Sequence, residues 1–246
     1  MNDRRLESAT MISGEESGHV DTFCADRLPP RAMWPVRDWS GVPELSYPSR
    51  LNCAAALLDG MVESGGGDRP VFRFSGGTWT YRHLMETANR IAHVLVDDLA
   101  AVPGNRVLLR GPNNPMMAAC WFAVVKMGGV AVCTMPLLRD REIRYAADKA
   151  SITLALTDTR LADDCDAGFA THADGSVRDG ARVVHFNSEA PGGLENLMRN
   201  KAATFDNRDT AADDIAIIAF TSGTTGEGKG TMHSHRDIMA VTDCFP

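Results

Sequence analysis

A six-residue apolar run followed by a glycine-rich loop is the feature that most limits what this chain can fold into. The run is Ile215–Phe220, and no polar residue alternates with its apolar side chains, which predicts a strand buried on both faces of a sheet. The loop that follows, Thr221–Lys229, reads TSGTTGEGK. Closely spaced backbone N–H groups in such a turn form an anion cradle, to which hydroxyls and an ammonium group add. The stretch therefore predicts a polyphosphate site at the end of a strand.

Strand and helix signals alternate along most of the chain, with short connections between them. This pattern predicts an α/β fold with layered, mostly parallel sheets flanked by helices and right-handed crossovers. The predicted strands cover 106–110, 130–134, 152–157, 182–186 and 215–220, and the predicted helices cover 51–63, 81–99, 115–127, 139–150, 194–200 and the residues after 234. A hairpin is predicted over 71–80 because Gly76-Gly77 separates two short strand-like runs.

Polar residues stand where these helices should begin. Asn52, Thr80, Asn114 and Ser234 can each cap a helix, and Pro115 after Asn114 suits the first helical position. Domain organisation follows from composition. Residues 1–22 are predicted to be a disordered tail, 23–50 a proline-rich arm that packs on the body, and 51–246 the body itself.

Composition excludes several classes of function. The net charge of −7 argues against a nucleic-acid partner, and the longest apolar stretch that could enter a membrane, 116–125, is too short to span it. No secretory signal is recognisable, and no pair among the six cysteines has C-x-x-C spacing, so we expect a reduced, cytoplasmic setting and no structural zinc. The cysteines are Cys24, Cys53, Cys120, Cys133, Cys165 and Cys244.

No metal site is predicted. The aspartates between residues 158 and 181 lack regular ligand spacing, so they indicate a solvated surface segment. His233 and His235 form an H-x-H pair, but no further ligands accompany them.

The loop also matches the first part of a P-loop, because Gly223 precedes Gly228-Lys229 by the required spacing. A P-loop enzyme needs Ser or Thr after the lysine to hold Mg²⁺, and Gly230 stands there instead. No later strand with a magnesium-binding Asp fits in the residues that follow. The P-loop reading is therefore rejected.

The residues Thr221–Gly230 resemble the signature T-S-G-T-T-G-x-P-K-G of adenylate-forming enzymes, with nine of ten positions in agreement when the free position is counted. That family includes acyl-CoA synthetases, luciferases and peptide-synthetase adenylation domains. The resemblance covers about residues 23–246 and includes the stretches 78–81, 111–129 and 135–158. It implies that residues 51–246 are a partial N-terminal AMP-binding domain, without the C-terminal remainder and the small C-terminal domain of the family. The stretch 31–59 looks most like aromatic-acid CoA ligases of the benzoate and 2-aminobenzoate type.

The resemblance implies a two-step reaction: a carboxylate and Mg-ATP give an acyl-adenylate, and coenzyme A then displaces AMP. The loop would hold the ATP phosphates through Thr221, Ser222, Gly223, Thr224, Thr225, Gly226, Gly228 and Lys229. His235 matches a histidine-containing position that lies near the acyl pocket in some members; the alternative is a helix-start histidine without a catalytic role. Gly228 departs from the signature, which has Pro there. Because glycine leaves the loop freer, we expect weaker ATP binding than in Gly228→Pro.

Later motifs of the family do not occur in these 246 residues, among them the Tyr-Gly-x-Thr-Glu segment, the Thr-Gly-Asp segment and the catalytic lysine of a C-terminal domain. Three hypotheses follow: an N-terminal part of an acid–CoA ligase, a chain completed by a separate partner chain, or a non-catalytic nucleotide-binding or interaction module. In each case we expect no turnover by these residues alone, and an exposed sheet edge prone to aggregation.

Overall fold

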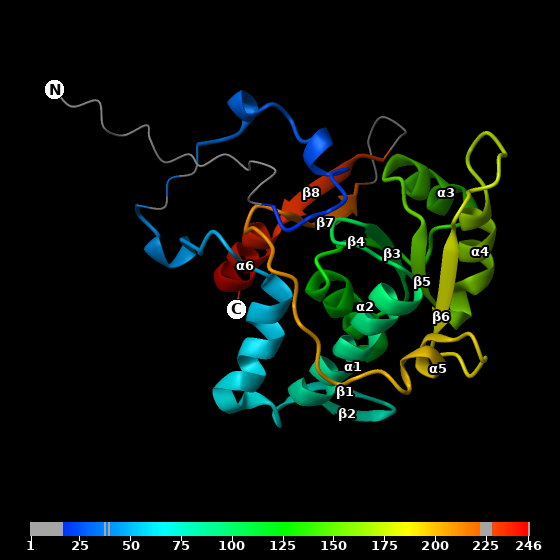
Figure 1. Cartoon of the computed structure of the whole chain (residues 1–246), viewed down its shortest axis with the longest axis horizontal. Coiled ribbons are helices and arrows are strands. Elements are labelled where there is room, and N and C mark those ends of the chain that lie inside the picture. The colour runs from blue at the N-terminus through cyan, green and yellow to red at the C-terminus, as the bar shows by residue number, and fades with distance from the viewer. Residues whose placement is uncertain (1–16, 37, 39, 222–227, 246) are drawn as a thin grey trace.

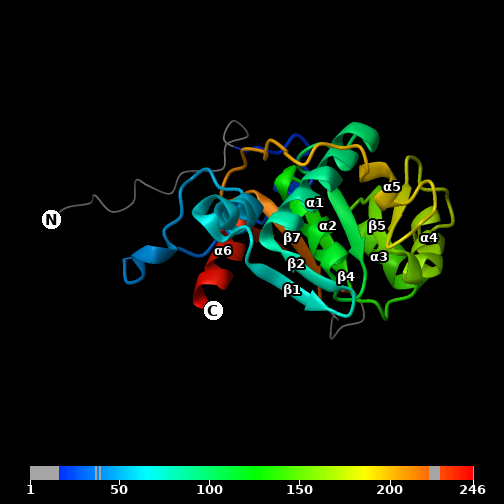
Figure 2. The same ribbon diagram turned by 90° about the horizontal axis from the view of Figure 1, so that it is seen from below.

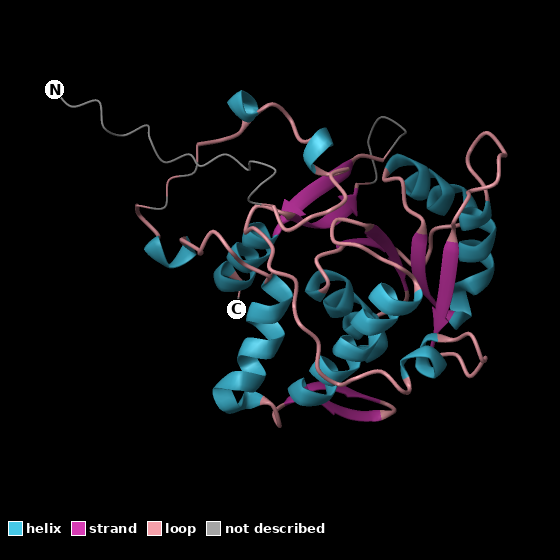
Figure 3. Ribbon diagram, viewed as in Figure 1, coloured by secondary structure: helices cyan, strands magenta, loops and turns pink. Residues whose placement is uncertain are grey.

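The computed structural model describes residues 17–36, 38, 40–221 and 228–245 (Figure 1). Its main feature is a six-stranded sheet of order β6-β5-β3-β4-β7-β8 with helices on both faces (Figures 1 and 3). Only β8 runs antiparallel to its neighbour, which confirms the predicted α/β class with a mostly parallel sheet. The strands are β3 (Arg106–Arg110), β4 (Val130–Thr134), β5 (Leu154–Asp158), β6 (Arg182–Phe186), β7 (Ile215–Phe220) and β8 (Gly230–Ser234).

The two faces of the sheet are buried by different helices. Successive side chains of a strand point to opposite faces, so Val107 and Leu109 of β3 join one core cluster and Leu108 joins the other. The first cluster includes α1 (Tyr81–His93) and α2 (Pro115–Lys126). The second includes α3 (Asp140–Lys149) and α4 (Ala162–Ala170), and the two layers can be followed in Figure 2. Each fully buried Val or Leu contributes about 1.5–3 kcal/mol, so the unbroken apolar strands fix this layered arrangement.

The predicted helix starts are confirmed. The side chains of Thr80, Asn114 and Ser234 accept hydrogen bonds from the backbone N–H three residues on, at the starts of α1, α2 and α6 (His235–Cys244). Asn52 accepts from the N–H groups of Ala54 and Ala55 and begins the helical stretch that follows it. The predicted hairpin is present as β1 (Pro70–Phe74) and β2 (Gly77–Thr80).

Helix α4 was not predicted. The aspartates of this region indicated a solvated surface segment, whereas Cys165 and Phe169 are fully buried against the sheet. Gly168 lets the helix approach α3 closely, because a Cβ there would lie 2.4 Å from the carbonyl oxygen of Asp140. The sequence gives only a weak signal for this helix. Three of its nine residues are aspartates, and one of its buried positions is a glycine. No group of three side chains that could hold a metal ion occurs within the described residues.

Strand β8 was also missed. It pairs with β7 from Phe220 opposite Gly230 to Ile215 opposite Ser234. Its five residues, GTMHS, contain a single large apolar side chain, so neither strand periodicity nor propensity marks it. Strand β7 thus lies between β4 and β8, and β8 is at the edge of the sheet.

The N-terminal segment differs from the predicted tail over residues 17–22. Ser17 Oγ and the N–H of Gly18 donate to the buried carboxylate of Asp214, at 2.6 and 2.8 Å. Asp21 pairs with Arg106 at the start of β3. These residues are therefore fastened to the sheet, and residues 1–16 lie outside the described part of the chain.

The proline-rich arm packs on the body near both of its ends. At its C-terminal end Tyr47 donates to Asp243 of α6, and Arg50 pairs with Asp209. Phe23 and Cys24 are buried in the second core cluster, whereas Met33 and Val36 are 73% and 95% exposed. Between residues 27–35 and β8 lies a pocket of about 370 Å³, whose lining includes Trp34 and Met232. No helix in the described residues is both long and apolar enough to cross a membrane.

Asn114 has two roles that can be separated. Its Oδ1 caps α2 by accepting from Met117 N, and its Nδ2 donates to Pro112 O and to the buried carboxylate of Asp158. We expect Asn114→Ala to lower the free energy of unfolding by about 2 kcal/mol, measured by urea denaturation. Thr80→Ala removes a cap alone and should cost about 1 kcal/mol. Equal losses in the two variants would show that the bond to Asp158 contributes nothing.

Candidate phosphate-binding site

The predicted phosphate loop connects the antiparallel strands β7 and β8. The structure describes its stem: the N–H of Thr221 donates to the carbonyl of Lys229 at 2.9 Å, directly beyond the Phe220–Gly230 pair. Lys229 is exposed, and no carboxylate of the described residues forms an ion pair with it. The other predicted phosphate-binding residues, Ser222, Gly223, Thr224, Thr225 and Gly226, lie outside the described residues.

The stem decides which groups of Thr221 and Gly228 can meet a ligand. The N–H of Thr221 is already used by Lys229, so its hydroxyl is the remaining donor toward a phosphate. The carbonyl of Gly228 accepts a hydrogen bond from the hydroxyl of Tyr145, at 2.8 Å. Tyr145 lies in α3 and was not singled out from the sequence, because no local pattern indicates a contact across 83 positions.

Gly228 is more tightly placed than the sequence indicates. A Cβ on this residue would lie 2.8 Å from the carbonyl oxygen of Thr221, a backbone atom. A side chain or a proline ring therefore fits only after the end of β7 or the start of β8 moves. This contact argues against the simple gain in ATP affinity that chain entropy alone predicts for Gly228→Pro.

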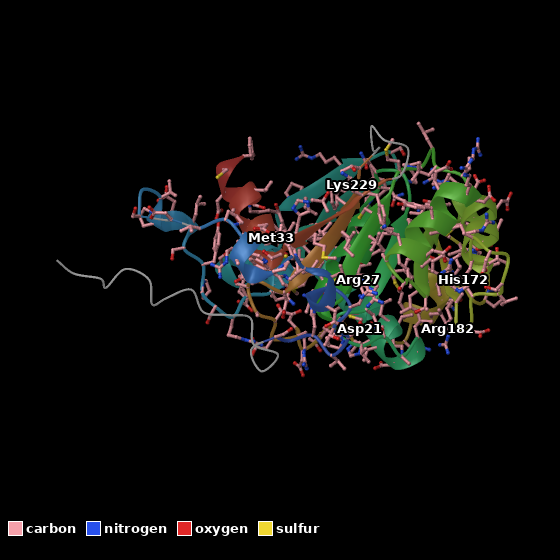
Figure 4. All side chains as sticks on the ribbon, turned by 90° about the horizontal axis from the view of Figure 1, so that it is seen from above. Asp21, Arg27, Met33, His172, Arg182 and Lys229 are labelled. Atoms are coloured by element: carbon pink, nitrogen blue, oxygen red, sulfur yellow. The ribbon has the colours of Figure 1, made fainter. Side chains whose placement is uncertain are left out.

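The described ends of the loop, Thr221 and Lys229, lie at the edge of the sheet where ligands of open α/β folds bind. The chain passes from β3 to β4 in one direction and from β4 to β5 in the other, which places the switch point at the carboxyl ends of β3 and β4. Such switch points open a crevice outside the strand ends. Strand β7 is the next neighbour of β4 and parallel to it, so Lys229 lies close to this switch point. Figure 4 labels Lys229 and Asp21 at opposite ends of the sheet.

Two buried charged residues fix the loops at this edge. Arg110, at the end of β3, is fully buried and donates to the carbonyl groups of Met135, Pro136 and Leu138, after β4. Asp158, at the end of β5, accepts from Asn114, Arg160 and Asn187. Burial raises the pKa of Asp158, but the hydrogen bonds, first of all from Arg160, outweigh it and lower the pKa to about 2. The sequence hint for this role of Arg110 is its position, because it is a charged residue at the end of the apolar strand RVLLR.

His235 lies at the other end of β7 from the loop. The strand register places its neighbour Ser234 opposite Ile215, whereas the loop follows Phe220. His235 is fully buried, and its Nδ1 accepts from the N–H of Cys53 at 3.2 Å, with Cys53 Sγ at the same distance. Burial lowers its pKa to about 3. These contacts agree with the alternative that His235 is a histidine at the start of a helix without a catalytic role. A place near an acyl pocket stays a prediction, and these contacts do not support it.

Titration of His235 should appear in the pH dependence of stability. The native residue stays neutral where the unfolded chain, with a histidine pKa near 6.5, binds a proton. The free energy of unfolding therefore falls as the pH decreases below about 6.5, by about 1.4 kcal/mol per pH unit and proton, until the pH approaches the folded pKa. Burial also lowers the pKa of His19, which adds a loss of the same sign. In His235→Gln, urea denaturation between about pH 5.5 and pH 4 should show a slope smaller by about one proton. Equal slopes would contradict this account.

Comparison with known proteins agrees with this geometry. The family model "AMP-binding enzyme" matches residues 62–245. The hydroxybenzoate–CoA ligase of Thauera aromatica is 25% identical over 200 residues, which are 80% of this chain and 37% of that protein. The uncharacterized acyl–CoA ligase YtcI of Bacillus subtilis is 29% identical over 160 residues, which are 64% of this chain and 28% of that protein. The chain thus spans well under half the length of these relatives.

Solved structures show the same fold. The anthranilate CoA ligase AuaEII, solved with anthranoyl-AMP, superposes with a TM-score of 0.73 at 19% identity, over 81% of this chain and 38% of that one. ATP-bound MatB from Rhodopseudomonas palustris superposes with a TM-score of 0.65 at 27% identity, over 78% of this chain and 36% of that one. The match to the family model extends over most of the sequence, and it includes the loop and both of its flanking strands. The chain belongs to the AMP-binding enzyme family.

Proposed function

We propose that this chain supplies the phosphate-binding part of an enzyme that activates a carboxylic acid with ATP and transfers it to coenzyme A. The observation that carries the proposal is the lysine-ended loop of the family signature, which leaves a parallel strand at the carboxyl edge of the sheet, next to the switch point. The acid is proposed to be aromatic, because hydroxybenzoate, benzoate and anthranilate ligases are among the similar proteins.

The proposed chemistry has two steps. A carboxylate oxygen attacks the α-phosphorus of ATP, the bond between the α-phosphorus and the bridging oxygen breaks, and pyrophosphate leaves. The sulfur of coenzyme A then attacks the acyl carbon, and AMP leaves as the thioester forms. The role of this chain lies in the first step. The ammonium of Lys229 and the hydroxyl of Thr221 face the charge that builds up on the departing pyrophosphate, and such contacts accelerate the step only if they strengthen in the transition state.

Mg²⁺ enters this scheme with the nucleotide. No described group of three carboxylate, histidine or cysteine side chains could hold the ion, so the described residues offer it no site of their own. When bound, the ion would neutralise part of the charge of the ATP phosphates. The exposed cation of Lys229 fits an additional contact to the same phosphates.

Removal of the Lys229 charge should weaken ATP binding more than the replacement of Lys229 by arginine or the loss of a lysine elsewhere. A hydrogen bond to a charged group contributes about 1.5–3 kcal/mol, so we expect Lys229→Met to raise the Kd for Mg-ATP by about tenfold to 100-fold in calorimetry. Lys229→Arg should keep part of the affinity. The matched control is Lys149→Met, which removes an exposed lysine from the far end of α3. Equal affinities of the unmodified chain and Lys229→Met would remove the basis of the proposal.

A pyrophosphate-release assay tests whether these residues catalyse the first step by themselves. With benzoate, hydroxybenzoate or 2-aminobenzoate, we expect these 246 residues to bind ATP without measurable turnover, because they lack the later motifs of the family. Pyrophosphate release above background would contradict that expectation.

A further inference from the structure

Tyr145 connects helix α3 to both sides of the phosphate-loop stem. Its hydroxyl donates to the carbonyl of Gly228, at 2.8 Å, on the side that leads into β8. Its ring meets the ring of Phe220, the last residue of β7, edge to face with centroids 6.3 Å apart. Helix α3 belongs to the crossover between β4 and β5, so this contact joins the stem to a part of the fold that the hairpin itself does not reach.

The hydrogen bond to Gly228 acts on Lys229 through the peptide group. The carbonyl of Gly228 and the N–H of Lys229 belong to one rigid plane, so fixing the oxygen also fixes the direction in which the chain enters Lys229. On the other side of this plane the N–H of Lys229 lies 3.4 Å from Thr221 Oγ1, a weak contact, and the carbonyl of Lys229 accepts from Thr221 N. Among the described residues, the Tyr145 bond is therefore the shorter of the two hydrogen bonds to this peptide.

Glycine at 228 makes that restraint important. The family signature has Pro at this position, which fixes φ and limits the unfolded and unbound states of the loop. Glycine has no such limit, so an unrestrained Gly228–Lys229 peptide would lose more entropy when a phosphate orders it. A hydroxyl that holds the carbonyl of Gly228 before the ligand arrives lowers that loss.

We propose that Tyr145 is a positioning residue for Lys229: it orders the Gly228–Lys229 peptide from α3 and so takes over the restraint that proline gives in the signature. The inference rests on the proposed function in one respect, since the ligand of Lys229 is taken to be the ATP phosphates. The ordering of the peptide does not depend on that assignment and can be measured without ligand.

The test compares Tyr145→Phe, which keeps the ring and removes the hydroxyl, with Tyr145→Ala, which removes both. Tyr47→Phe is the matched control, because Tyr47 also donates to a partner, Asp243, at a distance from the loop. Amide hydrogen exchange in the free chain is followed by NMR at Thr221 and Lys229, with Leu108 in β3 reporting global stability. For Tyr145→Phe we expect exchange at Thr221 and Lys229 about threefold to tenfold faster, with Leu108 unchanged. Tyr47→Phe should match the unmodified chain at all three amides.

Calorimetry with Mg-ATP supplies the functional readout. We expect the Kd of Tyr145→Phe to rise by about threefold to tenfold, and that of Tyr47→Phe to stay the same. Unchanged exchange in Tyr145→Phe overturns the inference, and a loss seen only in Tyr145→Ala would assign the effect to ring packing. Faster exchange with an unchanged Kd overturns the positioning role. If the unmodified chain binds no Mg-ATP, the proposed function fails, and the exchange comparison still decides whether Tyr145 orders the peptide.

Discussion

Burial of both faces of the parallel sheet is the constraint on which the rest of the structure depends. Strand β3 has no exposed residue, and alternate side chains along it enter two separate cores. A strand of this kind is stable only between two helix layers, so α1 and α2 must cover one face and α3 and α4 the other. The carboxyl edge is then the place where backbone and loop groups stay open to a ligand. The buried Arg110 and Asp158 hold that edge in shape.

Within the described residues, the stem of the predicted phosphate loop is held both by its own hairpin and by a helix of the scaffold. Pairing of β7 with β8 closes the stem, and Tyr145 of α3 adds a contact from the neighbouring layer. The site therefore combines a local part, the loop sequence, with a tertiary part that comes from a helix in another crossover. The family relation explains the first part. The second part links a tyrosine in α3 to a glycine at the position where the signature has proline.

Much of this fold could be predicted from sequence, and the failures have physical causes. Strands β3, β4, β6 and β7 have the predicted bounds, because unbroken apolar runs of that length fit a buried strand. Helix α4 and strand β8 were missed, because their buried sides hold small or polar residues such as Gly168 and Ser234. In the site, Thr221, Gly228 and Lys229 were expected, whereas Tyr145 and the carbonyl-binding role of Arg110 were not. Such contacts join residues far apart in sequence, and no local pattern encodes them.

The strand order has a consequence for the growing chain. Strand β4 ends at Thr134, but its second neighbour, β7, begins only at Ile215. At synthesis rates of ~5–20 residues per second, the ~80 residues between them take roughly 4–16 s to appear. During that time one edge of β4 has no partner strand, and an apolar edge is a target for pairing with other chains. The stem of the predicted phosphate loop, which needs both β7 and β8, can therefore form only after β3, β4, β5 and β6 have been synthesised.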